Sequence, residues 1–169
     1  MEVCPIVPNL GLTQQKESEN IMSTPSNLPD WIKSHIELYQ KDPEKGHHWD
    51  ASLAGGKGML TTLLLTTKGR KSGDDRLLPL IYKKIGNAYV IIASKGGFPS
   101  HPAWFLNLEA TPEAHIQVAH DHFDVRMRVA EGAERNDIWA QMVEVYPPYA
   151  DYQVSAGDRV IPVVVLEPQ

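Results

Sequence analysis

The sequence predicts an α+β protein in which about six antiparallel strands form a small barrel with helices around it. Short runs of aliphatic and β-branched residues are joined by turns that contain glycine or asparagine, which is typical of hairpins. These runs do not alternate regularly with helical segments, which argues against a doubly wound parallel sheet. The chain has 169 residues, a length that suits one domain with a substantial core.

The first third of the chain is expected to contain a leader, a helix and a loop. Residues 1–27 are rich in Pro, Asn, Gln, Ser and Glu, which predicts a disordered leader before a domain at 28–169. Apolar residues from Trp31 to Tyr39 recur with helical spacing and predict an amphipathic helix. Residues 44–58 hold four glycines without a clear period, which predicts a loop long enough to act as a flap.

The remaining elements follow from hydrophobic period and turn signals. Helices are expected at 101–110 and 131–145, because Trp104, Phe105 and Leu108 share one face of the first and Pro147 follows the second. Pro162 near the start of the last strand indicates an edge or a bulge there. The predicted strands are 61–67, 76–84, 88–94, 115–119, 122–130 and 160–166, with hairpin turns at Gly86-Asn87 and His120-Asp121.

Composition excludes several classes of protein. The net charge is −5, which argues against a general nucleic-acid binder. Cys4 is the single cysteine, so neither an intrachain disulfide nor a cysteine-rich metal site can form, and a cytoplasmic location is expected. No apolar run approaches the roughly 20 residues needed to span a bilayer, and the first residues lack the pattern of a signal peptide.

The most informative segment is residues 66–76, Thr-Thr-Lys-Gly-Arg-Lys-Ser-Gly-Asp-Asp-Arg. It lies between two apolar runs and predicts a tight hairpin turn whose glycines supply backbone freedom. Four cations, Lys68, Arg70, Lys71 and Arg76, gather on it in an otherwise acidic chain. Such a turn can hold phosphate or carboxylate groups; the alternative is a solvated hairpin tip.

Two further segments carry candidate binding residues. Ser94, Lys95, Gly96 and Gly97 directly follow a buried strand, so a ligand could approach the backbone closely there, although a plain loop would have the same composition. Tyr146, Tyr149 and Tyr152 recur every third residue around Pro147 and Pro148. Their rings could wall a pocket and their hydroxyls could face a reacting group, or they could simply pack in the core.

The residues do not indicate a metal enzyme or a hydrolase. The histidines lack the spacing of a helical zinc pair, so no metal is expected. The chain contains no GxSxG motif and no evident pair of catalytic carboxylates. In a barrel that binds a ligand without such groups, a cofactor would supply the chemistry.

Four segments together resemble the deazaflavin (F-420)-dependent nitroreductase family of the split β-barrel flavin and deazaflavin oxidoreductase superfamily. They are LLLTTKGRKSGDDRLLPLIY, VIIASKGGFPSHPAWFLNL, VYPPYADYQ and RVIPVVVLEP, in this order. The resemblance covers roughly residues 60–168. It implies a six-stranded antiparallel split β-barrel and coenzyme F-420, a deazaflavin with a phosphate and an anionic polyglutamate tail.

The resemblance also implies roles for residues of this chain. Ser94, Tyr149 and Tyr152 would be catalytic, with a tyrosine hydroxyl as proton donor, and Tyr146 would join both tyrosines in contacting the acceptor. Lys57, in the flap, would reach the tail, and Pro102 and Trp104 would continue the pocket. The cofactor-binding residues would be Arg70, Lys71, Ser72, Arg76, Pro79, Lys95, Gly96, Gly97 and Asn107.

The implied reaction is hydride transfer from reduced F-420 to an electron-poor small molecule such as a quinone, a nitroaromatic compound or an enone. Asp74 and Asp75 depart from the expected neutral residues of the turn and would weaken anion binding unless they face solvent or the arginines. Two alternatives stay open: an FMN-dependent split-barrel oxidoreductase, and a non-catalytic protein that binds a deazaflavin or a quinone. For partners, peripheral contact with a membrane through a quinone substrate is one expectation. For assembly, either a monomer or a homodimer is expected.

Overall fold

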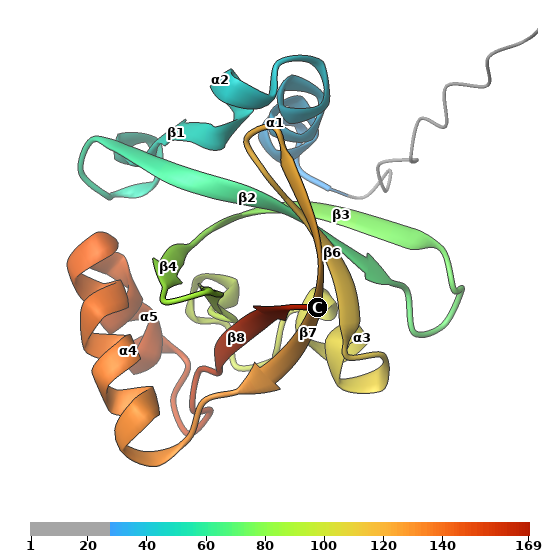
Figure 1. Ribbon diagram of the computed structural model, residues 1–169. Coiled ribbons are helices and arrows are strands. Elements are labelled where there is room, and N and C mark those ends of the chain that lie inside the picture. Colours follow the sequence, from blue (N-terminus) through green and yellow to red (C-terminus); the bar gives the residue numbers. More distant parts are fainter. Residues whose placement is uncertain (1–27) are drawn as a thin grey trace, which may run out of the picture.

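The computed structural model describes residues 28–169 and shows a curled antiparallel sheet with helices around it (Figure 1). The leader predicted at 1–27 lies outside the described residues. The sheet order is β1-β2-β6-β7-β8-β5-β4, and β3 also pairs with β2. All pairings in this part of the chain are antiparallel. The strands are β1 (His48–Asp50), β2 (Met59–Lys68), β3 (Asp75–Ile81), β4 (Lys83–Ile85), β5 (Ala88–Ile92), β6 (Glu113–Val118), β7 (Asp121–Val129) and β8 (Val163–Pro168).

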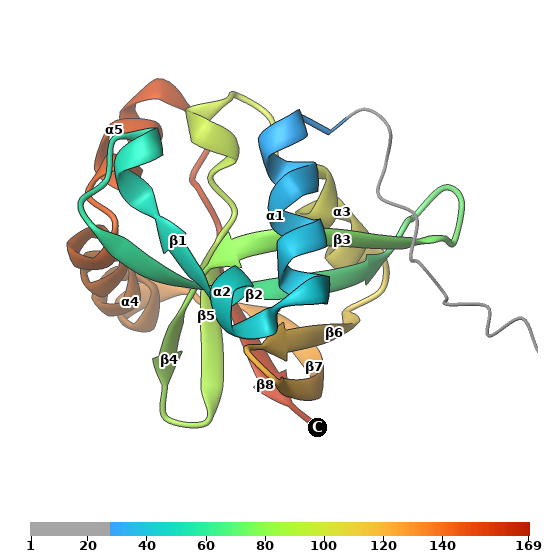
Figure 2. The same ribbon diagram turned by 90° about the horizontal axis from the view of Figure 1, so that it is seen from above.

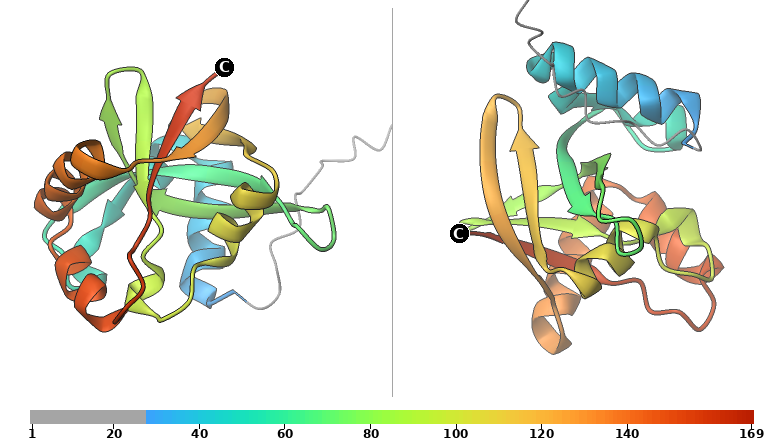
Figure 3. Two further views of the ribbon diagram at one scale, coloured as in Figure 1. Left: turned by 90° about the horizontal axis from the view of Figure 1, so that it is seen from below. Right: turned by 90° about the vertical axis from the view of Figure 1, so that its right-hand side faces the viewer.

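Helices cover the sheet on opposite sides. Figure 2 shows α1 lying across β2 and β3, and Figure 3 shows α1 and α4 on opposite sides of the sheet. Two short 3₁₀ turns, here η1 and η2, lie before β2 and after β5. The helices and turns are α1 (Asp30–Lys41), α2 (Pro43–His47), η1 (Ala51–Ala54), η2 (Lys95–Gly97), α3 (Ala103–Ala110), α4 (Gly132–Val145) and α5 (Pro148–Ser155).

Side-chain alternation along the strands explains why both faces of the sheet can be covered. On β2, Leu63 and Leu65 belong to the core inside the half-barrel, whereas Leu64 packs under α1. On β8, Val164 faces the same interior core, and Val163 and Val165 pack toward α4 and α5. Continuous apolar runs are therefore needed in these strands, because neither face is left to water.

The α+β class and the curled antiparallel sheet are confirmed, but the predicted count of six strands is too low. The strand expected at 76–84 is interrupted at Tyr82 and forms β3, which pairs with β2, and β4, which pairs with β5. The chain crosses there from one half of the curled sheet to the other (Figure 1). In addition, β1 forms within the predicted loop because His48 pairs with Thr61 of β2.

α4 ends at Val145, as predicted, but a further helix, α5, begins three residues later. Pro148 occupies the first turn of α5, where its missing N–H costs nothing. The last strand begins at Val163 rather than at 160, directly after Pro162, which cannot donate to the sheet. Among residues 28–169, no helix is long and apolar enough to cross a membrane.

Candidate functional site

A cavity of about 900 Å³ lies between the β2–β3 hairpin, η2, α3 and the start of α1. It brings together segments that are far apart in the sequence. Of the residues named from the sequence for the site, those that line it are Arg70, Lys71, Ser72, Arg76, Pro79, Ser94, Lys95, Gly96, Pro102, Trp104 and Asn107.

The lining of the cavity combines cations with a large apolar surface, and Lys95 Nζ lies over the ring of Phe98 at 5.6 Å. The hairpin turn contributes three of these cations, Arg70, Lys71 and Arg76. Aliphatic residues and three aromatic side chains, two of them exposed, supply the apolar surface. Trp31 of α1 is 59% exposed and Phe98 after η2 is 62% exposed, although large apolar side chains usually avoid such exposure. The apolar lining includes Trp31, Ile32, Leu78, Leu80, Ile92, Phe98 and Trp104.

The basic turn is closed by its own hydrogen bonds. The Gly69 amide donates to the Asp74 carbonyl at 2.8 Å, and the Gly73 amide donates to the Gly69 carbonyl at 2.7 Å. The Ser72 hydroxyl oxygen accepts from the Asp74 amide at 3.2 Å and from Arg76 Nη2 at 3.4 Å. Ser72 therefore holds one cation of the turn in place as well as lining the cavity.

Asn107 fixes a second cation of the turn. This side chain is buried in α3, and its Oδ1 accepts from the backbone amide of Arg70 at 3.2 Å and from Arg70 Nη1 at 3.0 Å. Its Nδ2 donates to the Thr67 hydroxyl at 3.2 Å. Asn107 thus ties the turn to α3 and orients the Arg70 guanidinium.

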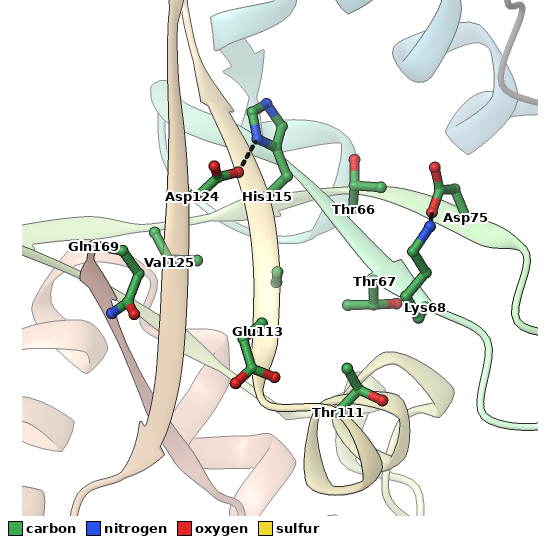
Figure 4. Close-up of a pocket in the computed structure, with 11 residues that line it drawn as sticks. Thr66, Thr67, Lys68, Asp75, Thr111, Glu113, His115, Asp124, Val125 and Gln169 are labelled. Atoms are coloured by element: carbon green, nitrogen blue, oxygen red, sulfur yellow. Dashed lines mark hydrogen bonds and ion pairs between the residues drawn. The ribbon is translucent and has the colours of Figure 1, made fainter.

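The two acidic residues of the turn do not neutralise the cations that line the cavity. Asp75 pairs with Lys68, and both line a second cavity of about 530 Å³ beside β6, where Figure 4 shows Lys68 reaching Asp75. Asp74 is exposed. Within residues 28–169, no carboxylate forms an ion pair with Arg70, Lys71 or Arg76. Three of the four predicted cations therefore remain available to an anion.

The segment after β5 has an unusual backbone. Lys95, Gly96 and Gly97 all have positive φ, at 47°, 61° and 83°. Gly96 faces open space in the cavity wall, whereas Gly97 is buried and does not line the cavity. A Cβ on Gly97 would lie 2.8 Å from the Tyr152 carbonyl oxygen. Gly97 is thus required for packing against α5, a reason that the sequence did not reveal.

The three tyrosines form a cluster of their own, with Tyr146 at the end of α4 and Tyr149 and Tyr152 on α5. Tyr146 and Tyr149 are buried, and the Tyr146 and Tyr152 hydroxyls lie 3.2 Å apart. Burial is the main reason why the pKa values of Tyr146 and Tyr149 are raised. None of the three lines the cavity, and neither does Lys57. The cluster meets the site at two places. The backbone of Tyr152 packs on Gly97. Trp49 contacts Tyr146 and stacks on Trp31, which lines the cavity.

Sequence reasoning missed two kinds of residue at this site. Trp31 and Phe98 form the apolar mouth, and only their exposure in the folded chain reveals it. Arg159 lies outside the cavity but hydrogen-bonds to the carbonyls on both sides of η2. Its only signal in the sequence was its place in the segment RVIPVVVLEP.

Comparison with known proteins identifies the family. A family model described as F-420H(2)-dependent quinone reductase matches residues 32–168. The chain belongs to this family. A protein of Mycobacterium tuberculosis that is named as an F-420H(2)-dependent quinone reductase is 37% identical over 114 residues, which cover 64% of this chain and 74% of that protein. A second protein of the same organism, named as a candidate for the same activity, is 37% identical over 116 residues, or 69% of this chain and 97% of its own length.

Solved structures agree with this assignment. An F-420-H2-dependent reductase is 43% identical, has a TM-score of 0.58 and covers 63% of this chain and 93% of its own. Another structure, described as a domain-swapped dimer, is 37% identical, has a TM-score of 0.60 and covers 82% of this chain and 98% of its own. The resemblance stated from the sequence is therefore confirmed, and coenzyme F-420 is the cofactor of this family.

The residues of the cavity fit this cofactor. Arg70, Lys71 and Arg76 form a cationic group with no carboxylate partner in the described part of the chain, which suits a phosphate and a carboxylate tail. Among the hydrogen bonds of residues 28–169, none uses the backbone amide of Lys95 or Gly96. These two amides are donors that a polar ring edge can accept from.

Proposed function

We propose that this protein is an oxidoreductase that transfers a hydride from reduced coenzyme F-420 to a quinone. Nitroaromatic compounds and enones, which are also electron-poor, are proposed as further acceptors. The single observation that carries this proposal is one cavity of about 900 Å³ whose lining joins the cationic turn to a large apolar surface.

The proposed roles follow from this lining. Arg70, Lys71 and Arg76 bind the phosphate and carboxylates of the cofactor, and Ser72 and Asn107 hold two of these cations in place. The apolar surface accommodates the cofactor ring and an apolar acceptor, and it excludes water from the reacting atoms. Coenzyme F-420, when bound, supplies the hydride from C5 of its reduced ring.

Binding of the cofactor tests the proposal directly. Oxidised F-420 and FMN are each titrated into the protein while cofactor fluorescence is recorded, first at low and then at high salt. We expect F-420 to bind more tightly, because its tail offers several negative charges, and its affinity to fall as salt rises, because the turn is exposed. The titrated protein is then given reduced F-420 and a panel of quinones, nitroaromatics and enones. Absence of F-420 binding at any salt concentration, or binding without turnover of any acceptor, would contradict the proposal; preference for FMN would support the rival oxidoreductase.

Tyr149 and Tyr152 remain our proposed proton donors. Their support is that the backbone of Tyr152 packs on Gly97 and that Tyr146 contacts Trp49, which stacks on Trp31. Tyr152 is the better candidate, since Tyr149 is buried and burial raises its pKa. We expect Tyr152→Phe to lower kcat about tenfold or more with little change in cofactor affinity, and Tyr149→Phe to have a smaller effect. Steady-state kinetics at saturating cofactor measures both, and a doubly substituted protein with full turnover would assign the proton to solvent.

The assembly and the place of action are also proposals. A monomer or a homodimer is proposed, and the 37% identical structure solved as a domain-swapped dimer supports the second. Cytoplasmic action is proposed from the cysteine content. The exposed Trp31 at the mouth of the cavity supports peripheral contact with a membrane that holds a quinone.

A further inference from the structure

The side chain of Arg159 connects the loop before β8 to both ends of η2. Nε donates to the Phe98 carbonyl at 2.9 Å, and Nη2 donates to the Ser94 carbonyl at 2.7 Å. Nη1 donates to the Ala93 carbonyl at 3.0 Å and lies 3.2 Å from Nδ1 of His101. One guanidinium therefore satisfies three backbone carbonyls that flank the cavity wall, without lining the cavity itself.

The segment that Arg159 braces is strained and has little support of its own. Lys95 has φ 47°, a conformation that is unfavourable for a residue with a side chain and that persists only where the surroundings fix it. Within the turn, only two short-range bonds are made, from Gly97 to Ser94 at 3.0 Å and from Phe98 to Lys95 at 3.2 Å. External contacts must therefore hold Lys95 and Gly96, which line the cavity, in this conformation.

Arg159 is itself held in place. Its carbonyl oxygen accepts from Gln153 Nε2 at 2.8 Å, and Oε1 of the same glutamine accepts from the Ile161 amide at 2.9 Å. Gln153 belongs to α5, the helix against which Gly97 packs. The backbone from which the Arg159 side chain extends is therefore held in place.

We infer that Arg159 is a positioning residue for the cofactor site, which acts by holding the carbonyls of Ser94 and Phe98 so that the Lys95 and Gly96 amides face the cavity. This inference rests on the proposed function of that cavity. It assigns to Arg159 a role in cofactor affinity although its side chain lies behind the wall that the cofactor would contact.

The test compares Arg159→Ala and Arg159→Lys with Arg135→Ala in the full-length protein. Arg135 is a matched control because it also donates to a backbone carbonyl, that of Ile161 at 2.8 Å, but it lies over Trp139 and forms no hydrogen bond to η2 among the described residues. Hydrogen exchange of residues 94–98 is measured without cofactor, and the Kd for oxidised F-420 is measured by fluorescence. We expect Arg159→Ala to speed hydrogen exchange in that segment and to raise Kd about tenfold. Arg159→Lys should give an exchange rate and a Kd between those of wild type and Arg159→Ala. Arg135→Ala should match wild type in both quantities.

The outcomes separate a positioning role from general stabilisation. Faster exchange across the whole sheet with unchanged Kd, or an equal rise in Kd for Arg135→Ala, would overturn the inference. If Arg159→Ala does not fold, Arg159→Lys decides, because it keeps the charge but cannot reach three carbonyls at once. Wild-type protein that binds no F-420 overturns the proposed function and this inference with it, whereas normal binding by the folded Arg159 variants overturns the inference alone.

Discussion

Simultaneous replacement of Arg70, Lys71 and Arg76 by glutamine is expected to weaken binding of oxidised F-420 by at least about 100-fold at low salt. Each charge-assisted hydrogen bond contributes on the order of 1.5–3 kcal/mol when its partners are not fully hydrated, and exposure of Arg70 and Lys71 reduces this figure for those two. The remaining affinity should depend less on salt, because Lys95 is then the one cation left in the described lining of the cavity. Fluorescence titration at two ionic strengths measures both effects.

A charge-matched control separates a local clamp from the overall charge of the protein. Lys41, Lys83 and Lys84 lie outside the lining of the cavity, and their joint replacement by glutamine changes the net charge by the same amount. A second control, Lys68→Gln with Asp75→Asn, removes the ion pair on the far side of the turn. We expect both controls to keep nearly wild-type affinity. Equal losses in the triple variant and the charge-matched control would show that the turn is not a specific anion site.

Substitution of two adjacent glycines is expected to separate folding from cofactor binding. In Gly97→Ala the new Cβ would lie 2.8 Å from the Tyr152 carbonyl oxygen and 2.9 Å from Ser155 Cβ, at a φ of +83°. Backbone strain and overpacking together should lower the free energy of unfolding by about 3 kcal/mol. Urea unfolding measures this change.

Gly96→Ala is the matched substitution. Its φ is +61°, but a Cβ there meets no atom within 4 Å, so strain alone should cost about 1 kcal/mol. The added methyl group would enter the space proposed for the cofactor ring, and we expect the affinity for F-420 to fall about tenfold. If Gly96→Ala were the more destabilising of the two, or if it bound cofactor normally, the proposed roles of Gly97 in folding and of Gly96 in cofactor binding would be wrong.

Local sequence signals predicted most of the secondary structure for identifiable reasons. The stripe from Trp31 to Tyr39 produced α1, and Gly86-Asn87 produced the β4–β5 hairpin turn. Each of these signals depends on residues that are close in the chain. The predictions were wrong where a strand depends on a partner that is distant in the chain. Tyr82 separates two strands because β3 and β4 pair with different neighbours. Strand β1 forms because it pairs with β2.

The site was predicted in part by the same kind of signal. The basic turn and the segment from Ser94 to Gly96 were predicted to bind a ligand, and both line one cavity. The sequence could not show that Lys68 is engaged by Asp75, that Gly97 faces α5, or that the tyrosines lie behind the cavity wall. Each of these facts depends on which face of a turn or helix is buried.

The sequence by itself determined that this chain forms a curled antiparallel sheet and carries a cationic hairpin turn, because alternation, glycine placement and charge are local properties. Tertiary structure alone decided which three cations of the turn line a cavity with an apolar mouth, and which residues merely support it. The physical reason is that charge pairing and burial depend on distances between segments that are remote in the chain, such as the 2.7 Å bond from Arg159 to the carbonyl of Ser94.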